Sequence, residues 1–185
     1  AARARALTVI ANNYAKGDAL AALYDQAVAA AKAAVASSPD LAEAHSALGF
    51  ALFNGRLDAA AATAPYAKSF ELGFGNADIL SAFANFAGRT GNFPDARKAI
   101  ARAQRLDPLN AVVFRNAGVI EYSARDYAAC QAPLRSALTI NPDLAGVHLV
   151  LGDVHLLAGR AAEAKAEYLQ ERNSLSRQRG LAIAD

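Results

Sequence analysis

The sequence predicts an all-α fold, an α-α superhelix (solenoid) of about five helix-turn-helix repeats followed by a C-terminal helix. Three observations predict it. About a quarter of the 185 residues are alanine, the strongest helix former, and Trp and Met are absent. Residues of matching character recur every 34 positions. Glycine and proline fall between the helical stretches, where they mark turns.

The 34-residue offset relates several columns of different chemistry. Pro108 and Pro142 stand 34 residues apart, each directly after an Asp or Asn. The other columns are Leu72, Leu106 and Ile140; Ala84, Gly118 and Gly152, with Gly49 upstream; Phe93, Tyr127 and Ala161; Ala96, Cys130 and Ala164; Ile100, Leu134 and Tyr168. Chance rarely keeps one offset across such different columns, and this period is typical of helix-turn-helix repeats.

Two stretches of the chain resemble the tetratricopeptide repeat (TPR) family. Residues 45–55 resemble the first helix of its motif, and residues 91–108 resemble its second half. The resemblance covers nearly the whole chain. It implies that each repeat is a pair of antiparallel helices whose crossing admits only a small residue. That accounts for the columns of Gly118 and Cys130, while larger residues such as Leu134 fill the gaps between helices.

We place the repeats at 8–41, 42–76, 77–110, 111–144 and 145–174, within a single domain of residues 1–185. The first repeat is the least regular. The second carries one extra residue and ends in Gly73-Phe74-Gly75-Asn76 instead of a proline turn. A C-terminal helix follows over 175–184. It is either a capping helix or the first helix of a sixth repeat in a longer chain.

Capping and breaking residues predict the helix ends. Asp40, which has Glu43 three residues later, and Asn76 are predicted to cap first helices, and Ser174 the C-terminal helix. Pro94 suits a first helical turn. The remaining markers are Gly55, Gly91 and Gly159 in the turns inside repeats, Pro39, Pro108 and Pro142 between repeats, and Pro65 and Pro133 inside second helices.

Composition argues against several classes of partner. With 19 basic and 17 acidic residues the net charge is +2, so we expect no nucleic-acid partner. The basic cluster of Arg97, Lys98, Arg102 and Arg105 is interpreted as a solvated helix face. No apolar run reaches the roughly 18–20 residues that span a bilayer, so we expect no membrane partner. The single cysteine forbids an internal disulfide, which fits a cytoplasmic location.

The sequence offers no motif for catalysis, for a metal or for a cofactor. His45 and His148 share a column, and His155 follows on the same helix face. We interpret them as core or groove-edge imidazoles, because no carboxylate or thiol has the spacing of a metal site. Cys130 lies in a small-residue column and is expected to be a buried, inert thiol. We therefore predict that the chain is not an enzyme.

The resemblance also predicts where a partner would bind. In the TPR family the first helices line the inner surface, and side chains there that point away from the second helices are not needed for packing. Asn can pair with a peptide backbone, Arg with carboxylates, and aromatic rings can anchor a partner. The alternative is that these are solvated residues and core aromatics. The predicted peptide- or protein-binding residues are Asn13, Lys16, Phe50, Phe53, Asn85, Arg89, Arg115, Asn116, Tyr122 and Asp153.

One specialised binding mode of the family is not expected. Some members hold a chaperone's C-terminal carboxylate with a set of Lys, Asn, Asn, Lys and Arg. Asn85 and Asn116 match two of those places, but Ser81, Gly146 and Val150 stand where basic residues are needed. A chaperone-tail clamp is therefore rejected.

The predicted function is a non-catalytic interaction module that binds a peptide or protein. The stretch 38–50 looks like the TPR regions of bacterial signalling proteins, in which the TPR region comes after the DNA-binding domain of a transcriptional regulator or after a nucleotide cyclase domain. The resemblance thus implies a bacterial signalling or regulatory protein. The alternatives are an oligomerisation scaffold, such as a homodimer through the C-terminal helix, and an accessory domain of an enzyme in a longer chain.

Overall fold

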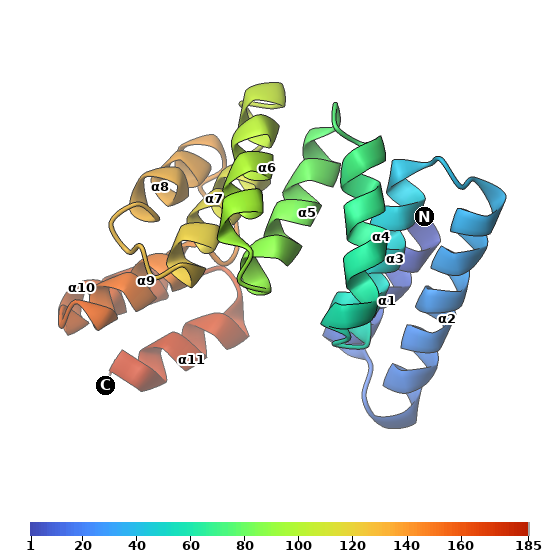
Figure 1. Ribbon diagram of the computed structural model, residues 1–185. Coiled ribbons are helices and arrows are strands. Elements are labelled where there is room, and N and C mark those ends of the chain that lie inside the picture. The colour runs from blue at the N-terminus through green and yellow to red at the C-terminus, as the bar shows by residue number, and fades with distance from the viewer. Residues whose placement is uncertain (185) are drawn as a thin grey trace. The chain divides into compact units, whose positions relative to one another are not determined.

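The computed structural model describes residues 1–184, except for the side chain of Asn13. The described residues form helices and turns and contain no strand (Figure 1). This confirms the all-α fold class. The helices are α1 (Ala2–Tyr14), α2 (Gly17–Ser37), α3 (Ala42–Phe50), the π-helix η1 (Ala51–Gly55), α4 (Ala59–Leu72), α5 (Ala77–Arg89), α6 (Phe93–Leu106), α7 (Ala111–Ser123), α8 (Gln131–Ile140), α9 (Val147–Leu157), α10 (Ala161–Gln170) and α11 (Ser174–Ala184).

The helices form two compact units, and the boundary between them falls inside α5. The first unit comprises Ala1–Phe86, and the second begins at Ala87. In the first unit α1 packs against α2, α2 against α3, and α3 against α4. In the second unit each helix from α6 to α11 packs against the next one along the chain. Each unit is therefore a row of helical hairpins.

The small-residue columns lie where two helices of a hairpin approach most closely, as predicted. Ala96, Cys130 and Ala164 are fully buried. The glycine column leaves no room for a methyl group, so the cost of glycine inside a helix is offset by close packing. An added Cβ would lie 2.7 Å from Tyr66 Cδ2 at Gly49, 2.5 Å from Leu134 Cγ at Gly118, and 2.3 Å from Tyr168 Cε1 at Gly152.

One residue in each of four turns adopts a left-handed backbone, at a constant spacing. The angle φ is 56° at Leu57, 85° at Gly91, 61° at Arg125 and 72° at Gly159. These positions stand 34 residues apart, so the repeat register is strict from the first of them onward. The prediction for Gly91 and Gly159 is confirmed. Gly55 does not take this role, because it ends η1 and an added Cβ there would lie 3.0 Å from Tyr24 Cδ1.

The extra residue of the second repeat is absorbed by the π-helical turn. Leu57 comes eight residues after Gly49, whereas Arg125 comes seven residues after Gly118. The additional residue falls where η1 (Ala51–Gly55) continues α3. A π-helical turn accommodates one more residue than an α-helical turn does. The packing columns before and after the insertion therefore keep their places.

The helix α8 begins four residues later than the 34-residue offset from α6 requires. Residues 127–130 form turns, and α8 begins only at Gln131. Pro133 thus lies within the second helix, as predicted, but in the first turn of α8. Its ring has no N–H to donate to the carbonyl of Ala129 and crowds that carbonyl, so helical geometry starts late. Pro65 lies inside α4, as predicted.

Asparagine caps two first helices. Asn76 Oδ1 accepts the N–H of Asp78 at 3.0 Å at the start of α5, which confirms that prediction. Asn110 Oδ1 accepts the N–H of Val112 at 3.2 Å at the start of α7. Each bond satisfies a backbone donor that the helix itself leaves unpaired.

Two other capping predictions are wrong by one residue. The N-cap position of α3 is Leu41 and makes no side-chain cap bond, so Asp40 lies just outside the helix. At α11 the acceptor is Asn173 Oδ1, which takes the N–H of Ser176 at 2.9 Å. Ser174 is already the first helical residue. Pro94 lies in the first turn of α6, as predicted.

The helix α2 corrects the expectation that no apolar stretch of the chain is long enough to span a bilayer. By length and composition alone Gly17–Ser37 is long and apolar enough to cross a membrane, with a mean hydropathy of 1.2 over an 18-residue window. Alanine produces this value, because its small side chain is apolar. Only 11% of that window is buried, and Ala27 and Ala31 are the buried positions of the helix.

Candidate functional site

In the first unit the predicted aromatic residues are engaged within the fold. Phe50, at the end of α3, lies under the guanidinium of Arg5 from α1, whose Cζ is 5.6 Å from the ring centroid. Arg5 Nη2 also donates to Ser46 Oγ at 2.5 Å. Phe53 meets Phe86 edge-on, with ring centroids 5.1 Å apart. These rings therefore contribute to packing, and α1 covers this part of α3.

The polar residues predicted for the first unit, as far as the structure describes them, come from different elements. Lys16 is exposed at the N-cap position of α2, so it lies in the turn after α1. Asn85 is half-buried on α5. The side chain of Asn13 lies outside the described part of the chain.

In the second unit, three helices bring polar side chains together around Asp153. This residue lies on α9, and its side chain is 18% exposed. Tyr168 from α10 donates its hydroxyl to Asp153 Oδ1 at 2.8 Å, and Tyr122 from α7 donates to Oδ2 at 3.4 Å. Arg179 from α11 donates through Nη2 to Oδ2 at 3.5 Å. We call these four residues the Asp153 cluster.

The tyrosines of the Asp153 cluster keep their protons over a wide pH range. Burial raises the pKa of Tyr122, and the charge of Asp153 raises it further. Burial and the hydrogen bond to Asp153 also raise the pKa of Tyr168. Both hydroxyls therefore act as hydrogen-bond donors that fix the orientation of the carboxylate.

The other predicted residues of the second unit lie on α7 and at the end of α5. Arg115 donates through Nη1 to the carbonyl of Ala145 at 3.3 Å and through Nη2 to Asn116 Oδ1 at 3.4 Å. Burial lowers the pKa of Arg115, and the nearby charge of Glu171 opposes that shift. Asn116 is buried, whereas Arg89 is exposed in the last turn of α5. The structure thus brings Tyr122 and Asp153 together, with Arg115 on the same helix as Tyr122.

A buried carboxylate supports the start of α9. Leu144 stands where Asn76 and Asn110 cap the earlier first helices, so α9 lacks a cap of its own. Glu171, only 1% exposed, replaces it and accepts the N–H of Gly146 at 2.9 Å and of Leu149 at 3.1 Å. The negative charge also suits the positive end of the helix dipole.

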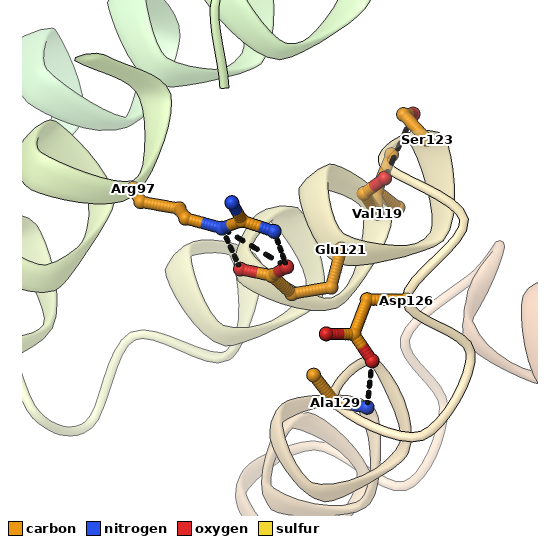
Figure 2. A network of polar contacts seen from close by, with 6 residues as sticks. All are labelled: Arg97, Val119, Glu121, Ser123, Asp126 and Ala129. Atoms are coloured by element: carbon orange, nitrogen blue, oxygen red, sulfur yellow. Dashed lines mark hydrogen bonds and ion pairs between the residues drawn. The ribbon is translucent and has the colours of Figure 1, made fainter. Parts of the chain in front are cut away.

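A separate hollow lies on another face of the second unit, between α6, α7 and α8. Its volume is about 390 Å³, and most of its lining is apolar. At its edge Arg97 forks onto Glu121, with Nη2 2.6 Å from Oε2 and Nε 2.9 Å from Oε1 (Figure 2). Arg97 is exposed, as the predicted solvated helix face requires, and it is also paired with a carboxylate. The lining residues are Arg97, Ile100, Ala101, Gln104, Ala117, Glu121, Ala129 and Pro133.

Solved structures share this arrangement over almost the whole chain. TTC0263, described as a thermophilic TPR protein of Thermus thermophilus, has a TM-score of 0.75 at 20% sequence identity, covering 98% of this chain and 96% of that one. PilF of Pseudomonas aeruginosa has a TM-score of 0.68 at 19% identity, covering 98% and 88%. The chain has the TPR fold. PilW, described as a type IV pilus biogenesis factor, has a TM-score of 0.72 at 18% identity, covering 95% and 78%.

Comparisons with protein-family models and with curated proteins give no match. The similarity to solved TPR structures confirms the predicted solenoid of helical hairpins. Function is inferred from the residues of the Asp153 cluster, because one fold can serve many functions.

Sequence reasoning missed three residues that the TPR fold places beside the predicted ones. Tyr168 was assigned to a packing column, which its ring confirms, but the hydroxyl at its tip was overlooked. Arg179 lies in the C-terminal helix, whose orientation no repeat column fixes. Glu171 lies directly after α10, and the sequence around it does not indicate that it caps α9. The missing asparagine at Leu144 was the one clue that a cap for α9 had to come from elsewhere.

The histidines and the cysteine make local contacts within the TPR fold. His148 Nδ1 lies 2.7 Å from Glu167 Oε2, and His45 Nε2 lies 2.7 Å from the carbonyl of Pro39. Cys130 is buried, as predicted, and burial raises the pKa of its thiol to about 11. Across the described residues no three His, Cys, Asp or Glu side chains are grouped to hold a metal ion.

Proposed function

We propose that the chain is a non-catalytic protein-interaction module, and that the face formed by α7, α9 and α11 holds a segment of a partner polypeptide. We call this face the binding face. The Asp153 cluster is the observation that carries the proposal. It gathers a half-buried carboxylate, a tyrosine from α7 and an exposed arginine from α11 at one place on this face. Such a mixture of aromatic and charged groups is typical of interfaces.

The TPR fold supports the proposal in general terms, because stacked helical hairpins offer extended surfaces for partners. A place within a bacterial signalling protein is a further part of the proposal, supported by the resemblance of residues 38–50. A cytoplasmic location is likewise proposed, in keeping with a single cysteine that is buried as a free thiol.

A peptide selection tests the binding face without knowledge of the natural partner. A phage-displayed library of random peptides is selected against the full chain, and the enriched peptide is synthesised. Calorimetry then measures its Kd for the wild type and for a Tyr122→Ala, Arg115→Ala double variant. We expect binding at least about tenfold weaker in the double variant, since each truncation removes a central contact.

The matched control is Lys98→Ala, an exposed change on α6. It should leave the Kd unchanged. The proposal is wrong if no peptide is enriched above the background of an unrelated helical protein, or if the double variant binds as tightly as the wild type does.

A second candidate function is self-association through α11. Leu175 and Ile183 on this helix are 76% and 58% exposed, and burying two such large apolar side chains against a second copy of the chain would favour association. A Leu175→Lys, Ile183→Lys variant should then lower the mass found by light scattering from that of a dimer to that of a monomer. A wild-type chain that is already monomeric at high concentration would eliminate this candidate.

A further inference from the structure

The Asp153 carboxylate accepts hydrogen bonds from two neutral tyrosine hydroxyls and faces the positive guanidinium of Arg179. The hydroxyls of Tyr168 and Tyr122 bond to different oxygens of the carboxylate, at 2.8 Å and 3.4 Å. Neither hydroxyl carries a charge that would balance the carboxylate. The shorter bond, from Tyr168, fixes the orientation of Asp153, while the charge of the carboxylate is left for a cation to match.

The cation that stands there is loosely held. Arg179 Nη2 lies 3.5 Å from Asp153 Oδ2, at the long limit of a hydrogen bond, and the arginine side chain is 58% exposed against 18% for the aspartate. An exposed arginine at this distance contributes little to stability and exchanges readily with solvent. The guanidinium therefore marks where a cation fits and does not close the position permanently.

The surroundings favour a guanidinium over a compact ammonium. The Tyr122 ring lies beside that of Tyr127, with centroids 5.8 Å apart and a 53° angle between the ring planes. A planar guanidinium can stack flat on such a ring and fork onto a carboxylate through two N–H groups, whereas a compact ammonium has neither the flat face nor the fork.

We propose that the Asp153 cluster is a receptor for an arginine side chain of the partner polypeptide, and that Arg179 of α11 occupies this receptor until the partner displaces it. The inference rests on the proposed function, because it assigns the partner's chemistry at the same binding face. It also makes the Arg179 side chain a competitor of the partner's arginine, so Arg179 weakens binding while it is paired with Asp153.

The test uses three capped pentapeptides, Ala-Ala-Xaa-Ala-Ala, in which Xaa is arginine, lysine or citrulline. Each is titrated into the full ¹⁵N-labelled chain, and amide shifts of α7 and α9 report binding. Citrulline keeps the shape of arginine and lacks its charge. We expect the arginine peptide to bind at least about tenfold more tightly than the citrulline peptide, and more tightly than the lysine peptide.

Three single variants locate the effect. Asp153→Asn should weaken binding of the arginine peptide at least about tenfold. Arg179→Ala should tighten it by about 1.5- to 5-fold, the factor that a surface ion pair is worth. Arg177→Ala removes another exposed arginine of α11 and should change nothing. The amide spectra of the variants show whether each one is folded.

The outcomes separate this inference from the proposed function. If the selected peptide binds the face but Asp153→Asn has no effect on either peptide, the arginine receptor is wrong and the binding face stands. If Arg179→Ala weakens binding of the arginine peptide, Arg179 contributes to binding and does not compete with the partner's arginine. If neither peptide binds, both proposals fail.

Discussion

Gly152 of α9 faces the ring of Tyr168 of α10 so closely that a Cβ on the glycine would lie 2.3 Å from Tyr168 Cε1. The same ring also meets α11, where a Cβ on Gly180 would lie 2.4 Å from Cδ1. Two glycines thus let three helices close around one tyrosine. That packing delivers the Tyr168 hydroxyl to Asp153, so the small-residue column also builds the candidate site.

Substituting Gly152→Ala should destabilise the chain by about 1–3 kcal/mol, because the new methyl group overpacks the contact with Tyr168. The gain in helix propensity from alanine, about 0.5–1 kcal/mol, offsets only part of this. Thermal and urea denaturation measure the change. Gly75→Ala is the control, since an added Cβ there meets nothing within 4 Å, and it should lie within about 0.5 kcal/mol of the wild type.

Removing Glu171, which caps α9 from beyond α10, should destabilise the chain more than removing an N-cap residue that directly precedes its helix. Glu171→Ala leaves the partly buried N–H groups of Gly146 and Leu149 without an acceptor, for an expected loss of about 1–3 kcal/mol. Asn110→Ala, which removes the side-chain cap of α7, should cost about 1 kcal/mol. Urea denaturation compares the two. Equal stability of Glu171→Ala and the wild type would show that the carboxylate does not support α9.

The thiol of Cys130 should make the chain less stable in mild alkali. Folding raises its pKa from 9.0 to about 11, so between these values the unfolded chain loses the proton while the folded chain keeps it. Stability is therefore expected to fall as pH rises from about 9 to about 11, and this component should vanish in Cys130→Ala. Denaturation of both proteins at several pH values isolates the difference. Identical pH profiles would contradict the assignment.

The π-helical turn should tolerate loss of its extra residue. Deleting Asn54 shortens η1 and restores the seven-residue spacing that follows Gly118 in the later repeat. We expect a folded protein with a destabilisation of no more than about 1–3 kcal/mol. Deleting Ser123 from α7, which has no surplus residue, should shift the packing columns and lower the melting temperature further. A larger loss for the Asn54 deletion would contradict this account of η1.

The sequence predicted the parts of the fold that repeat. Gly118, Leu134 and Tyr168 occupy the places that the 34-residue offset assigned, because each is fixed by a crossing that every hairpin shares. Features that occur once were missed. Pro133 delays α8, which no offset reveals. The left-handed backbone at Leu57 does follow the offset from Gly91, but it was missed because leucine is not a residue that favours this conformation.

The candidate site was only partly predictable for the same reason. Applying the 34-residue offset to the first helices identified Tyr122 and Asp153, and the structure places a hydrogen bond between them. It could not find Arg179, because α11 follows the last repeat and its direction depends on packing against Tyr168. It also could not show that Arg5 of α1 covers Phe50, since the first repeat departs from the common register.

The most direct test of the account maps where a selected peptide lies. The peptide carries a nitroxide spin label, and paramagnetic broadening is measured in the amide spectrum of the ¹⁵N-labelled chain. Broadening confined to α7, α9 and α11 is predicted, strongest near Tyr122 and Asp153. Broadening centred on Ala101 and Ala129, at the hollow between α6 and α8, would contradict the central claim.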